Sequence, residues 1–506
     1  MRVGILEVID LPCNSLTSKI YNLLVTRQYA AITPQAISVW CRQLGHDTFY
    51  ATYYGMGNPA KLLPQDLDII FFSCCTPASF FVYALAKLYR KKGTRVAIGG
   101  PHAESFPVDC LRFFDLVIKD CDRQLIADVV KGKFPSGHYI SSSKPFEDCP
   151  TVEERMPEIK SSIFFQRKWP GLFAFVPVIT SMGCPYTCDF CTDWDNPYRL
   201  LSTDRFVADL QFLTKNYPRL LMGFHEPNFA VQFERVFDII ETISPESRIP
   251  YLMECSLSIL TESRMKRLKE TKCIVAIHGI ESWQNYSVKA GMKGKGGLEK
   301  VKGVVKHLQQ INQYVPYLQA NMIFGLDSDT GEEPINLTKH FMEQTPFAWP
   351  VINIPVPFGG TPMFDQYFAD GRILAEMPFA FYYMPYLVTT LKNYDPITYY
   401  EKMVEMSTFA FSPKMLKRRI KSTSNWRIKT VHIARNQSEK EFNQRYHKIL
   451  NLLRSDAQFR EFHEGKSAKL PEFYHNIYEK RLGRYADLLS REDRRPCLEQ
   501  LSPQIV

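Results

Sequence analysis

Short apolar runs that alternate with amphipathic stretches limit how this chain can fold more than any other feature of its sequence. Runs that are apolar on both faces, separated by helical segments, are typical of a parallel sheet covered by helices on both sides. The amino-terminal part shows this alternation, with apolar runs at 3–9, 67–73, 95–100 and 115–120 and amphipathic stretches at 35–46, 79–93 and 123–132. We therefore expect an α/β fold that begins with a doubly wound, Rossmann-like domain.

The alternation resumes after a stretch rich in Pro, Ser and charge at 133–160, which we interpret as a linker. Apolar runs follow at 175–181, 219–224, 250–256, 273–280, 318–326 and 351–356, with amphipathic segments between them. Six strand–helix units in series indicate a full or partial barrel of parallel strands. The 506 residues then divide into a doubly wound domain with its linker at 1–150, a barrel at 151–375 and a mostly helical carboxyl-terminal domain at 376–506.

The composition, with 45% hydrophobic and 23% charged residues, is close to the average for ordered globular proteins. The sequence starts without a secretory signal, and its most apolar run, 377–388, contains two prolines and is too short to span a bilayer. We therefore expect a cytoplasmic protein that begins at Met1 and keeps its 13 cysteines reduced. Cysteines 74, 75, 255 and 273 lie in apolar runs, and we expect them to be buried as small hydrophobic side chains.

The formal net charge of +9 gathers mainly in Lys414–Arg435. A charge of this size is modest for the length, and we expect no nucleic-acid partner. Two interpretations of the basic stretch stay open: a solvated basic face, or a site for an acidic partner such as phospholipid in a peripheral membrane contact.

Three cysteines, Cys184, Cys188 and Cys191, follow the first strand of the predicted barrel in the segment MGCPYTCDFC. Thiolates are the ligands of iron–sulfur clusters, and three of them leave one iron of a 4Fe-4S cluster open to a reactant. A zinc site with a distant fourth ligand is the alternative, although zinc sites usually use cysteine pairs and no second pair is present. The spacing therefore predicts a cluster with an open iron.

The C-x-x-x-C-x-x-C segment, with the aromatic Phe190 before its third cysteine, resembles the signature of the radical S-adenosylmethionine (SAM) superfamily. The resemblance extends from the start of the chain to the end of the predicted barrel, and it implies that the barrel is partial. It also implies that the open iron binds the amino and carboxylate groups of SAM. An electron, supplied by a reducing donor such as flavodoxin or ferredoxin, then splits the sulfonium, and the 5'-deoxyadenosyl radical removes hydrogen from a substrate carbon.

Further segments resemble the subgroup of this superfamily that carries an amino-terminal cobalamin-binding domain, and they fall at successive strand ends. They are FHEPNF at 224–229, GIES at 279–282, FGLDSDT at 324–330 and IPVPFGGTPMFDQYFADGRI at 354–373. The resemblance implies that Glu226 accepts a hydrogen bond from the methionine ammonium of SAM and that Glu281 accepts from its ribose hydroxyls. Ser256 and Gly325 are the other SAM contacts that it implies.

Each of these residues also has a plainer interpretation when it is taken alone. A carboxylate such as Glu226 or Glu281 is often a solvated loop acid, and Gly325 and Gly359 are consistent with turn glycines. Asp327, in the same segment as Gly325, is consistent with a structural cap. The order of the segments along the chain favours the SAM site.

Two amino-terminal segments, FFSCCTP and AIGGPHAESFP, resemble parts of the same subgroup that contact the corrin and its nucleotide tail. The sequence differs from that subgroup in two ways: it has no D-x-H-x-x-G, and KDCDR stands where G-E-G-E is usual. We therefore expect cobalamin to bind without an axial histidine, and we assign His102 a hydrogen-bonding role. The cobalamin contacts implied by the resemblance are Ser73, Thr76, Gly99, Gly100, Pro101 and His102.

The function that the resemblance implies is cobalamin-dependent methylation of an unactivated carbon in a small molecule or lipid. A radical rearrangement, cyclisation or oxidation without methyl transfer is a second hypothesis, and a non-catalytic metal-binding interaction protein is a third. The segment 377–386 suggests an apolar substrate wall, although such a run is more often plain core. The sequence does not name the substrate.

Overall fold

All strands of the first sheet run parallel, as the apolar runs predicted. The computed structural model describes residues 1–9, 26–163, 174–284, 286 and 289–506. Within these ranges the first sheet has seven strands in the order β15-β6-β5-β4-β3-β1-β2. Their bounds are β1 Arg2–Val8, β2 Asp47–Tyr53, β3 Ile69–Cys74, β4 Arg95–Gly99, β5 Leu116–Ile118, β6 His138–Ser141 and β15 Gln504–Ile505. The order reverses between β1 and β3, which places a ligand crevice at the carboxyl ends of these strands.

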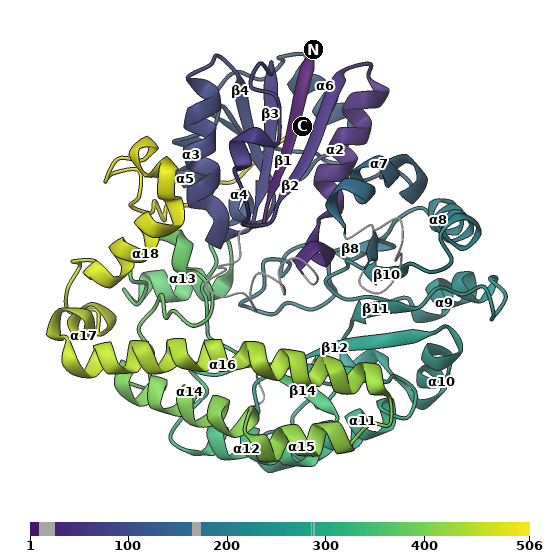
Figure 1. Ribbon diagram of the computed structural model, residues 1–506, viewed down its shortest axis with the longest axis vertical. Helices are drawn as coiled ribbons and strands as arrows, with labels where there is room; N and C mark the ends of the chain where they lie inside the picture. Colours follow the sequence, from purple (N-terminus) through teal and green to yellow (C-terminus); the bar gives the residue numbers. More distant parts are fainter. Residues whose placement is uncertain (10–25, 164–173, 285, 287–288) are drawn as a thin grey trace.

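Helices cover both faces of this sheet because alternate strand residues enter two separate cores. Ile70 and Phe72 of β3 pack in one core, and their neighbours Ile69 and Phe71 pack in the other. The helices are α2 Ile32–Gln43, α3 Ser79–Arg90, α4 Pro101–Ser105, α5 Pro107–Leu111 and α6 Arg123–Val130, with 3-10 helices η1 Thr26–Tyr29, η2 Pro59–Lys61 and η3 Thr76–Ala78. The doubly wound domain is confirmed, and it forms the upper part of the molecule in Figure 1.

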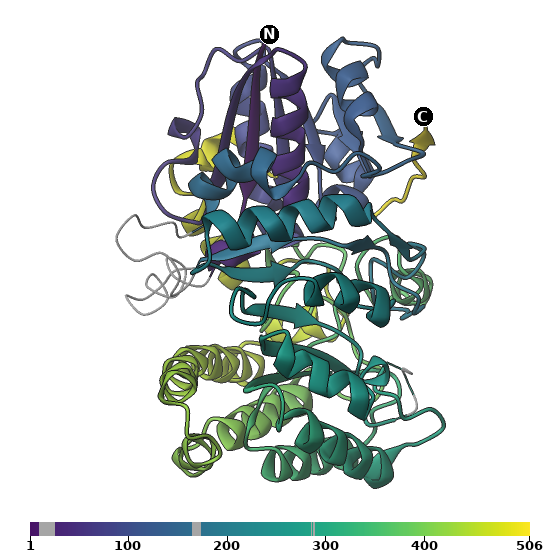
Figure 2. The same ribbon diagram turned by 90° about the vertical axis from the view of Figure 1, so that its right-hand side faces the viewer.

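The second sheet is the predicted partial barrel. In the described part of the chain it has six parallel strands in the sequential order β7-β10-β11-β12-β13-β14. The strands are β7 Phe175–Val178, β10 Leu221–Phe224, β11 Tyr251–Glu254, β12 Cys273–Glu281, β13 Tyr317–Ile323 and β14 Ala348–Asn353. The helices that follow them are α8 Thr203–Asn216, α9 Phe233–Glu241, α10 Glu262–Glu270, α11 Gly297–Ile311, α12 Glu333–Gln344 and α13 Pro362–Ala369, with η4 Leu257–Ile259. The barrel lies below the first domain in Figures 1 and 2.

The stretch interpreted as a linker contains two regular elements. Strand β6 (His138–Ser141) pairs with β5, and helix α7 (Val152–Ser162) packs on both α2 and α8. The helix begins with a capping box in which Thr151 Oγ1 accepts from the Glu154 backbone N–H and the Glu154 carboxylate accepts from the Thr151 backbone N–H. Pro157 inside the helix hid its periodicity, although the Thr-x-x-Glu spacing was present in the sequence.

The carboxyl-terminal segment is mainly helical and shares its core with the first domain. Its helices are α14 Pro396–Ala410, α15 Pro413–Lys421, α16 Trp426–Ser455, α17 Ala457–His463 and α18 Glu472–Leu482, with η5 Phe379–Phe381 and η6 Gly483–Leu488. Phe80 of α3 packs on Tyr478 of α18, at 5.2 Å between ring centroids. Residues 377–382 are buried in this core, so the segment considered as a substrate wall is core.

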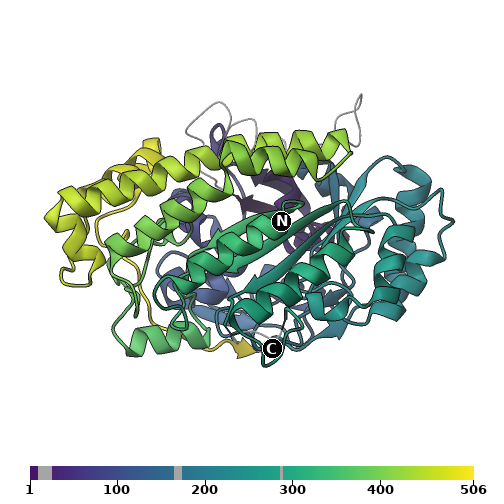
Figure 3. The same ribbon diagram turned by 90° about the horizontal axis from the view of Figure 1, so that it is seen from below.

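The longest helix, α16, runs beside α14 and lies against the barrel (Figures 1 and 3). The chain then returns to the first domain and ends in β15, which adds a parallel strand to the free edge of β6. Among the helices of the described ranges, none combines the length and the apolar composition needed to cross a membrane.

Candidate active site

The cysteine loop starts directly after β7 and is closed at its base by a short hairpin. Strand β8 (Ser181–Met182) pairs antiparallel with β9 (Arg199–Leu200). Next to the hairpin, Gly183 has a φ of 69°, and a Cβ there would lie 2.3 Å from the Pro197 carbonyl oxygen. Only glycine fits this close approach of two backbones.

The three cysteines occupy one compact loop inside this closure. The Cys184 backbone N–H donates to the Asn196 carbonyl at 3.1 Å, and the Cys191 N–H donates to the Cys188 carbonyl at 3.0 Å. Cys184 is buried, and Cys188 and Cys191 are half-buried. The loop therefore offers three thiols at an enclosed but accessible position.

The last segment of the barrel supports this loop from the outside. The Met363 backbone N–H donates to the Asp189 carbonyl at 3.0 Å, and Trp194 Nε1 donates to the Gly360 carbonyl at 2.6 Å. Phe190, the aromatic residue before the third cysteine, stacks on Tyr286 with a ring separation of 6.0 Å. The GGTP segment thus positions the cysteine loop.

Lys289 lies close to the cysteine loop, and no pattern in the sequence marked it as a site residue. Burial lowers the pKa of Lys289, but Glu281 and then Cys188, Cys184 and Cys191 raise it, and the net shift is upward. Its ammonium therefore lies within electrostatic reach of all three thiols and of one predicted SAM-binding carboxylate. A cation at this position suits a bound group that carries negative charge.

The donor set fits a 4Fe-4S cluster. Three thiols from one loop are the ligands that such a cluster needs, and each would bind a different iron. In the described ranges, no three His, Cys, Asp or Glu side chains are spaced to hold a single metal ion. This finding concerns side chains that hold one metal ion together. It does not apply to a 4Fe-4S cluster, in which each of the three cysteines would bind a different iron.

Glu226 lies directly beside the start of the cysteine loop, with one carboxylate oxygen still available. Its Oε1 accepts from the Thr180 hydroxyl at 2.8 Å and from the Thr180 backbone N–H. Its Oε2 is buried without a hydrogen-bond partner among the described residues. Burial raises the pKa of Glu226 to about 7. An unpartnered carboxylate oxygen at this position fits a ligand ammonium.

Glu281 is turned toward the same region by a bulge. The pairing of β12 with β13 shifts register between Gly279 and Glu281, and Glu281 has a φ of 64°. A Cβ on Gly279 would lie 2.2 Å from Glu281 Oε1, so the glycine makes room for the carboxylate. Burial raises the pKa of Glu281 to about 7, against the opposing effect of Lys289.

Ser256 is held at the end of β11 by the asparagine of the FHEPNF segment. Asn228 Oδ1 accepts from the Ser256 backbone N–H at 2.9 Å and from its hydroxyl at 3.1 Å. Asn228 Nδ2 is buried and has no partner within the described residues. Asn228 therefore joins two strand ends and keeps a donor for a ligand, a role that sequence reasoning missed.

Position 325 requires glycine for two reasons: its backbone φ is positive, and a side chain there would collide with a neighbouring ring. Its φ is 104°, and a Cβ there would lie 2.8 Å from the Tyr399 ring. Asp329 Oδ2 accepts from the Gly325 and Leu326 backbone N–H groups at 2.9 and 3.1 Å, so Asp329 organises this turn. Asp329 was not selected from the sequence.

Asp327, expected to be a cap, forms an ion pair. Both of its carboxylate oxygens accept from Arg372, each at 2.8 Å, and Tyr367 also donates to it at 3.2 Å. Arg372 lies in the GRI that ends the GGTP segment. The pair therefore ties the loop after β13 to the segment that supports the cysteines.

The glycine turn of the first domain lies beside the end of β3. Gly100 has a φ of 86°, and a Cβ there would lie 2.7 Å from Ser73 Oγ. At Gly99 a Cβ would lie 3.2 Å from the Ile118 carbonyl. Pro101 begins α4 and is exposed. The crevice side of these strand ends therefore keeps backbone rather than side chains close to any ligand.

His102 and Thr76 are buried within the first domain. His102 Nε2 hydrogen-bonds Tyr83 at 2.5 Å, and its Nδ1 lies 3.4 Å from Thr76 Oγ1. The Tyr83 hydroxyl also donates to Asp109 at 2.5 Å. Burial lowers the pKa of His102 to about 3. The structure thus supports a hydrogen-bonding role for His102. Cys75, expected to be buried, is exposed at the end of β3.

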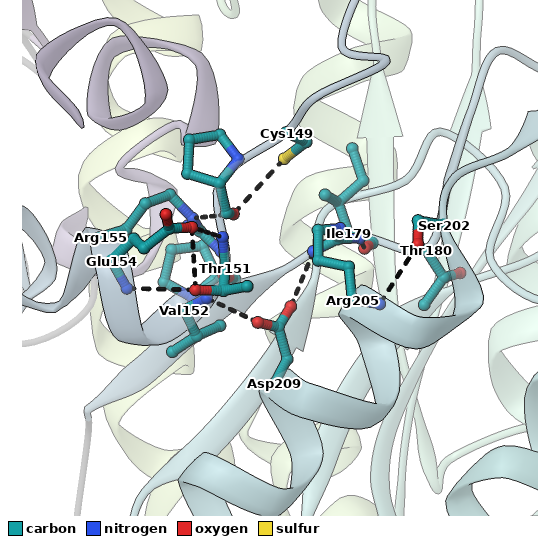
Figure 4. Close-up of polar contacts among 12 residues, drawn as sticks. Cys149, Thr151, Val152, Glu154, Arg155, Ile179, Thr180, Ser202, Arg205 and Asp209 are labelled. Atoms are coloured by element: carbon teal, nitrogen blue, oxygen red, sulfur yellow. Dashed lines mark hydrogen bonds and ion pairs between the residues drawn. The ribbon is translucent and has the colours of Figure 1, made fainter. Parts of the chain in front are cut away.

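A buried polar junction fixes the end of β7, from which the cysteine loop starts (Figure 4). Arg155 of α7 donates to the Pro177 carbonyl at 3.1 Å, and Arg205 of α8 donates to the Ile179 carbonyl. Asp209 accepts from Arg205 at 2.7 Å and from the first backbone N–H of α7 at 2.6 Å. Both guanidinium groups are buried and donate to carbonyl or carboxylate oxygens, so they position the strand end, and only Arg205 Nε is without a hydrogen-bond partner there among the described residues.

The two domains meet at their strand-end loops. A Cβ on Gly359, which follows β14, would lie 1.9 Å from the Ser105 carbonyl oxygen at the end of α4. Lys119, after β5, lies 4.0 Å from Asp195 of the cysteine loop. The site predicted for SAM and the crevice predicted for cobalamin therefore belong to adjoining loops.

Comparison with known proteins agrees with this arrangement. The family model described as Radical SAM superfamily matches residues 178–341, which include all three cysteines, Glu226, Glu281 and Gly325. Residues 178–341 therefore match a radical SAM domain, which supports an enzyme of that class. The resemblance stated from the motifs is confirmed, and the interaction-protein hypothesis is set aside.

The relatives within this class are methyltransferases by name. Bacteriochlorophyllide d C-12(1)-methyltransferase of Chlorobaculum tepidum is 22% identical over 317 residues, 60% of this chain and 67% of that protein. Bacteriochlorophyllide d C-8(2)-methyltransferase of the same organism is 23% identical over 356 residues, 67% of this chain and 77% of that protein. Hopanoid C-2 methylase of Rhodopseudomonas palustris is 23% identical over 296 residues, 56% of this chain and 54% of that protein.

Two solved structures share the fold. The cobalamin-dependent SAM radical enzyme OxsB, with aqua-cobalamin and SAM bound, matches 96% of this chain and 79% of its own at a TM-score of 0.57 and 13% identity. The radical SAM methyltransferase TsrM from Kitasatospora setae, with tryptophan and a SAM analogue bound, matches 75% of this chain and 77% of its own at a TM-score of 0.53 and 13% identity. The predicted fold class is therefore confirmed over nearly the whole chain.

Proposed function

We propose that this radical SAM enzyme is a cobalamin-dependent methyltransferase that acts on an unactivated carbon of a small molecule or lipid. One observation carries the proposal: the segment that supports the cysteine loop of a radical SAM barrel contacts, through Gly359, the end of the helix that follows the glycine turn of a doubly wound domain, at Ser105. Such an arrangement lets a substrate carbon lie between two cofactors held by different domains. The names of the relatives support methyl transfer as the reaction.

The residues assigned to SAM would hold it by complementary charge and hydrogen bonding. Glu226 Oε2 accepts from the methionine ammonium, and Glu281 accepts from the ribose hydroxyls. Ser256 and the turn at Gly325 form the remaining wall. When bound, the cluster on Cys184, Cys188 and Cys191 supplies the electron that splits SAM.

Cobalamin would occupy the crevice at the carboxyl ends of β1 and β3. Gly99, Gly100 and Pro101 let the nucleotide tail approach the backbone, and Ser73 offers a hydroxyl beside them. His102 and Thr76 act from behind this turn by fixing α4. When bound, cobalamin supplies the methyl group. With both ring nitrogens of His102 engaged inside the protein, no described imidazole of this turn is offered to the cobalt.

The remaining partners are also proposals. A reducing donor such as flavodoxin or ferredoxin would deliver electrons to the half-buried side of the cysteine loop. The names of the relatives, which specify bacteriochlorophyllide d and a hopanoid, support a pigment or lipid as the substrate. Pigment and lipid extracts are therefore the first substrates to test. A cytoplasmic location and the absence of a nucleic-acid partner stay predictions.

The test is anaerobic reconstitution with iron, sulfide and cobalamin, followed by mass spectrometry of bound cofactors and of products. We expect 5'-deoxyadenosine and a product heavier than its substrate by one CH2 unit. The Cys188→Ala variant is the matched control and should form neither. Formation of 5'-deoxyadenosine with a product of unchanged or lower mass would favour the rearrangement or oxidation hypothesis instead.

A further inference from the structure

The basic side chains of the stretch Lys414–Arg435 form two groups: some contact the rest of the protein, and others are exposed to solvent. Arg419 is 1% exposed and donates to the Ala410 carbonyl at 2.6 Å. Arg435 donates to the Tyr317 hydroxyl at 2.9 Å and to Gln319 at 2.7 Å, both on β13. These two guanidinium groups fix α15 and α16 to the barrel, so they are not available to a partner.

The outward half of α15 is uniformly basic. Lys414, Lys417 and Lys421 are exposed, and their spacing of three and four residues places them on one face of the helix. The sequence from 406 to 438 contains no Asp or Glu, so no acid within this segment offsets their charge. This face therefore presents a concentrated positive field to solvent.

Next to these lysines, the start of α16 exposes apolar side chains. Trp426 is 68% exposed, Ile433 is 51% exposed and Val431 is 37% exposed. Trp426 and Ile433 are seven residues apart, so they share one face of the helix. Arg427, beside Trp426, is also exposed. Single exposed apolar residues are ordinary, but Trp426 and Ile433 together make an apolar patch on their shared face, whereas Val431 lies on a different side of the helix.

The basic and apolar sets adjoin, because α15 packs on the start of α16 and a short turn connects the two helices. Figure 2 shows these yellow-green helices at the left of the lower half of the molecule, away from the first domain. A helix surface that combines exposed Trp and Ile with Lys and Arg is typical of peripheral membrane contacts. The apolar groups enter the headgroup region, and the cations pair with anionic lipid.

We propose that the α15–α16 corner binds the surface of an anionic phospholipid bilayer. This inference goes beyond the proposed function and does not rest on it, since the corner contains none of the residues assigned to either cofactor. Binding to a bilayer would bring the enzyme to the place where apolar substrates are dissolved. Acidic proteins and nucleic acids would also pair with the lysines, but the bilayer is favoured because one interface accommodates both the cations and the exposed apolar side chains of Trp426 and Ile433.

The experiment is flotation of the reconstituted full chain with vesicles of equal parts phosphatidylglycerol and phosphatidylcholine, compared with vesicles of phosphatidylcholine alone. We expect binding to the anionic vesicles only. The triple variant Lys414→Gln, Lys417→Gln, Lys421→Gln should bind about 100-fold more weakly, since each basic residue near an anionic surface contributes roughly fivefold. Trp426→Ala should also weaken binding. The fluorescence of Trp426 itself is the wild-type signal minus that of Trp426→Phe, and brominated lipid should quench it.

The matched control changes three exposed lysines elsewhere, Lys91→Gln, Lys131→Gln and Lys480→Gln. It removes the same charge and should leave vesicle binding unchanged. All variants should form 5'-deoxyadenosine at the wild-type rate, which separates this test from failure of the proposed function. Equal loss in the control, binding that is indifferent to Trp426, or absence of binding to anionic vesicles would overturn the proposal.

Discussion

Replacing Gly359 by Ala tests whether the contact between the two domains sets the reaction geometry. The added Cβ would lie 1.9 Å from the Ser105 carbonyl oxygen and 2.6 Å from Gln500 Nε2. A relaxed carbon–oxygen contact is about 3.3–3.6 Å, so the two backbones must separate by roughly 1.5 Å. The side chain of Gln500 can move, but the carbonyl is backbone at the end of α4.

The size of the effect follows from this displacement. Forcing a methyl group into a closed contact typically costs about 1–3 kcal/mol. A displacement of about 1 Å between reacting groups can slow a reaction by about 100-fold. We therefore expect Gly359→Ala to lower the Tm modestly and to reduce methylated product by about 100-fold. Formation of 5'-deoxyadenosine should be largely retained, because the residues assigned to the cluster and to SAM lie in the barrel alone.

The assay measures both products from the same anaerobic reaction, together with thermal unfolding. Gly360→Ala is the matched control: its φ is 77°, and a Cβ there meets nothing within 4 Å. It adds the same atom one residue away and carries only backbone strain, about 1–2 kcal/mol. If Gly359→Ala forms product at the wild-type rate, or if both variants lose product equally, the contact does not set the geometry.

Three further predictions concern the barrel. Cys188→Ala should abolish cluster absorbance and 5'-deoxyadenosine formation, whereas Cys255→Ala, at a buried cysteine outside the loop, should keep both. Burial raises the pKa of Glu226 to about 7, so its carboxyl is largely neutral below that pH and becomes able to pair with the SAM ammonium above it. SAM affinity, measured by calorimetry, should therefore rise from about pH 6 to about pH 8. The Glu226→Gln variant should bind SAM more weakly and should not show this rise. A wild-type affinity that does not change with pH would contradict the assignment. Lys289→Gln should lower the reduction potential of the cluster by an amount on the order of tens of millivolts in a redox titration, because a cation stabilises the more negative reduced state. The exposed Lys295→Gln is its control, and an unchanged potential in Lys289→Gln would place the ammonium elsewhere.

The sequence was sufficient to predict the six described strands of the barrel sheet and four of the seven described strands of the first sheet, because their signal is local. Strands such as β3 and β13 are read from runs of apolar residues, and the cysteine spacing lies within eight residues of one loop. The same locality gave Gly100 and Gly325, whose positive φ values follow from their own turns. Predictions of this kind need no knowledge of what packs against the element.

The features that could not be predicted from the sequence depend on contacts between residues far apart in the chain. Lys289 acquires its role from cysteines roughly a hundred positions earlier, and Asp327 pairs with Arg372 rather than capping a helix. Gly359 has no positive φ to mark it, since its requirement comes from Ser105 in another domain. Strand β15 has only two residues, and the free edge of β6 rather than its own propensity makes it a strand.

The carboxyl-terminal segment contacts both the doubly wound domain and the barrel. Arg481 of α18 donates to the Pro77 carbonyl beside the end of β3 at 3.2 Å and to the Ala380 carbonyl at 2.9 Å. Further along, the Cys497 backbone N–H donates to Asp109 at 2.8 Å, and Asp109 in turn accepts from the tyrosine that bonds His102. The same segment ends as a strand of the first sheet, while α16 is bonded to β13 of the barrel. Since neither domain alone determines where the other lies, we infer that substitutions in this segment alter the coupling between the two sites more than the chemistry at either one.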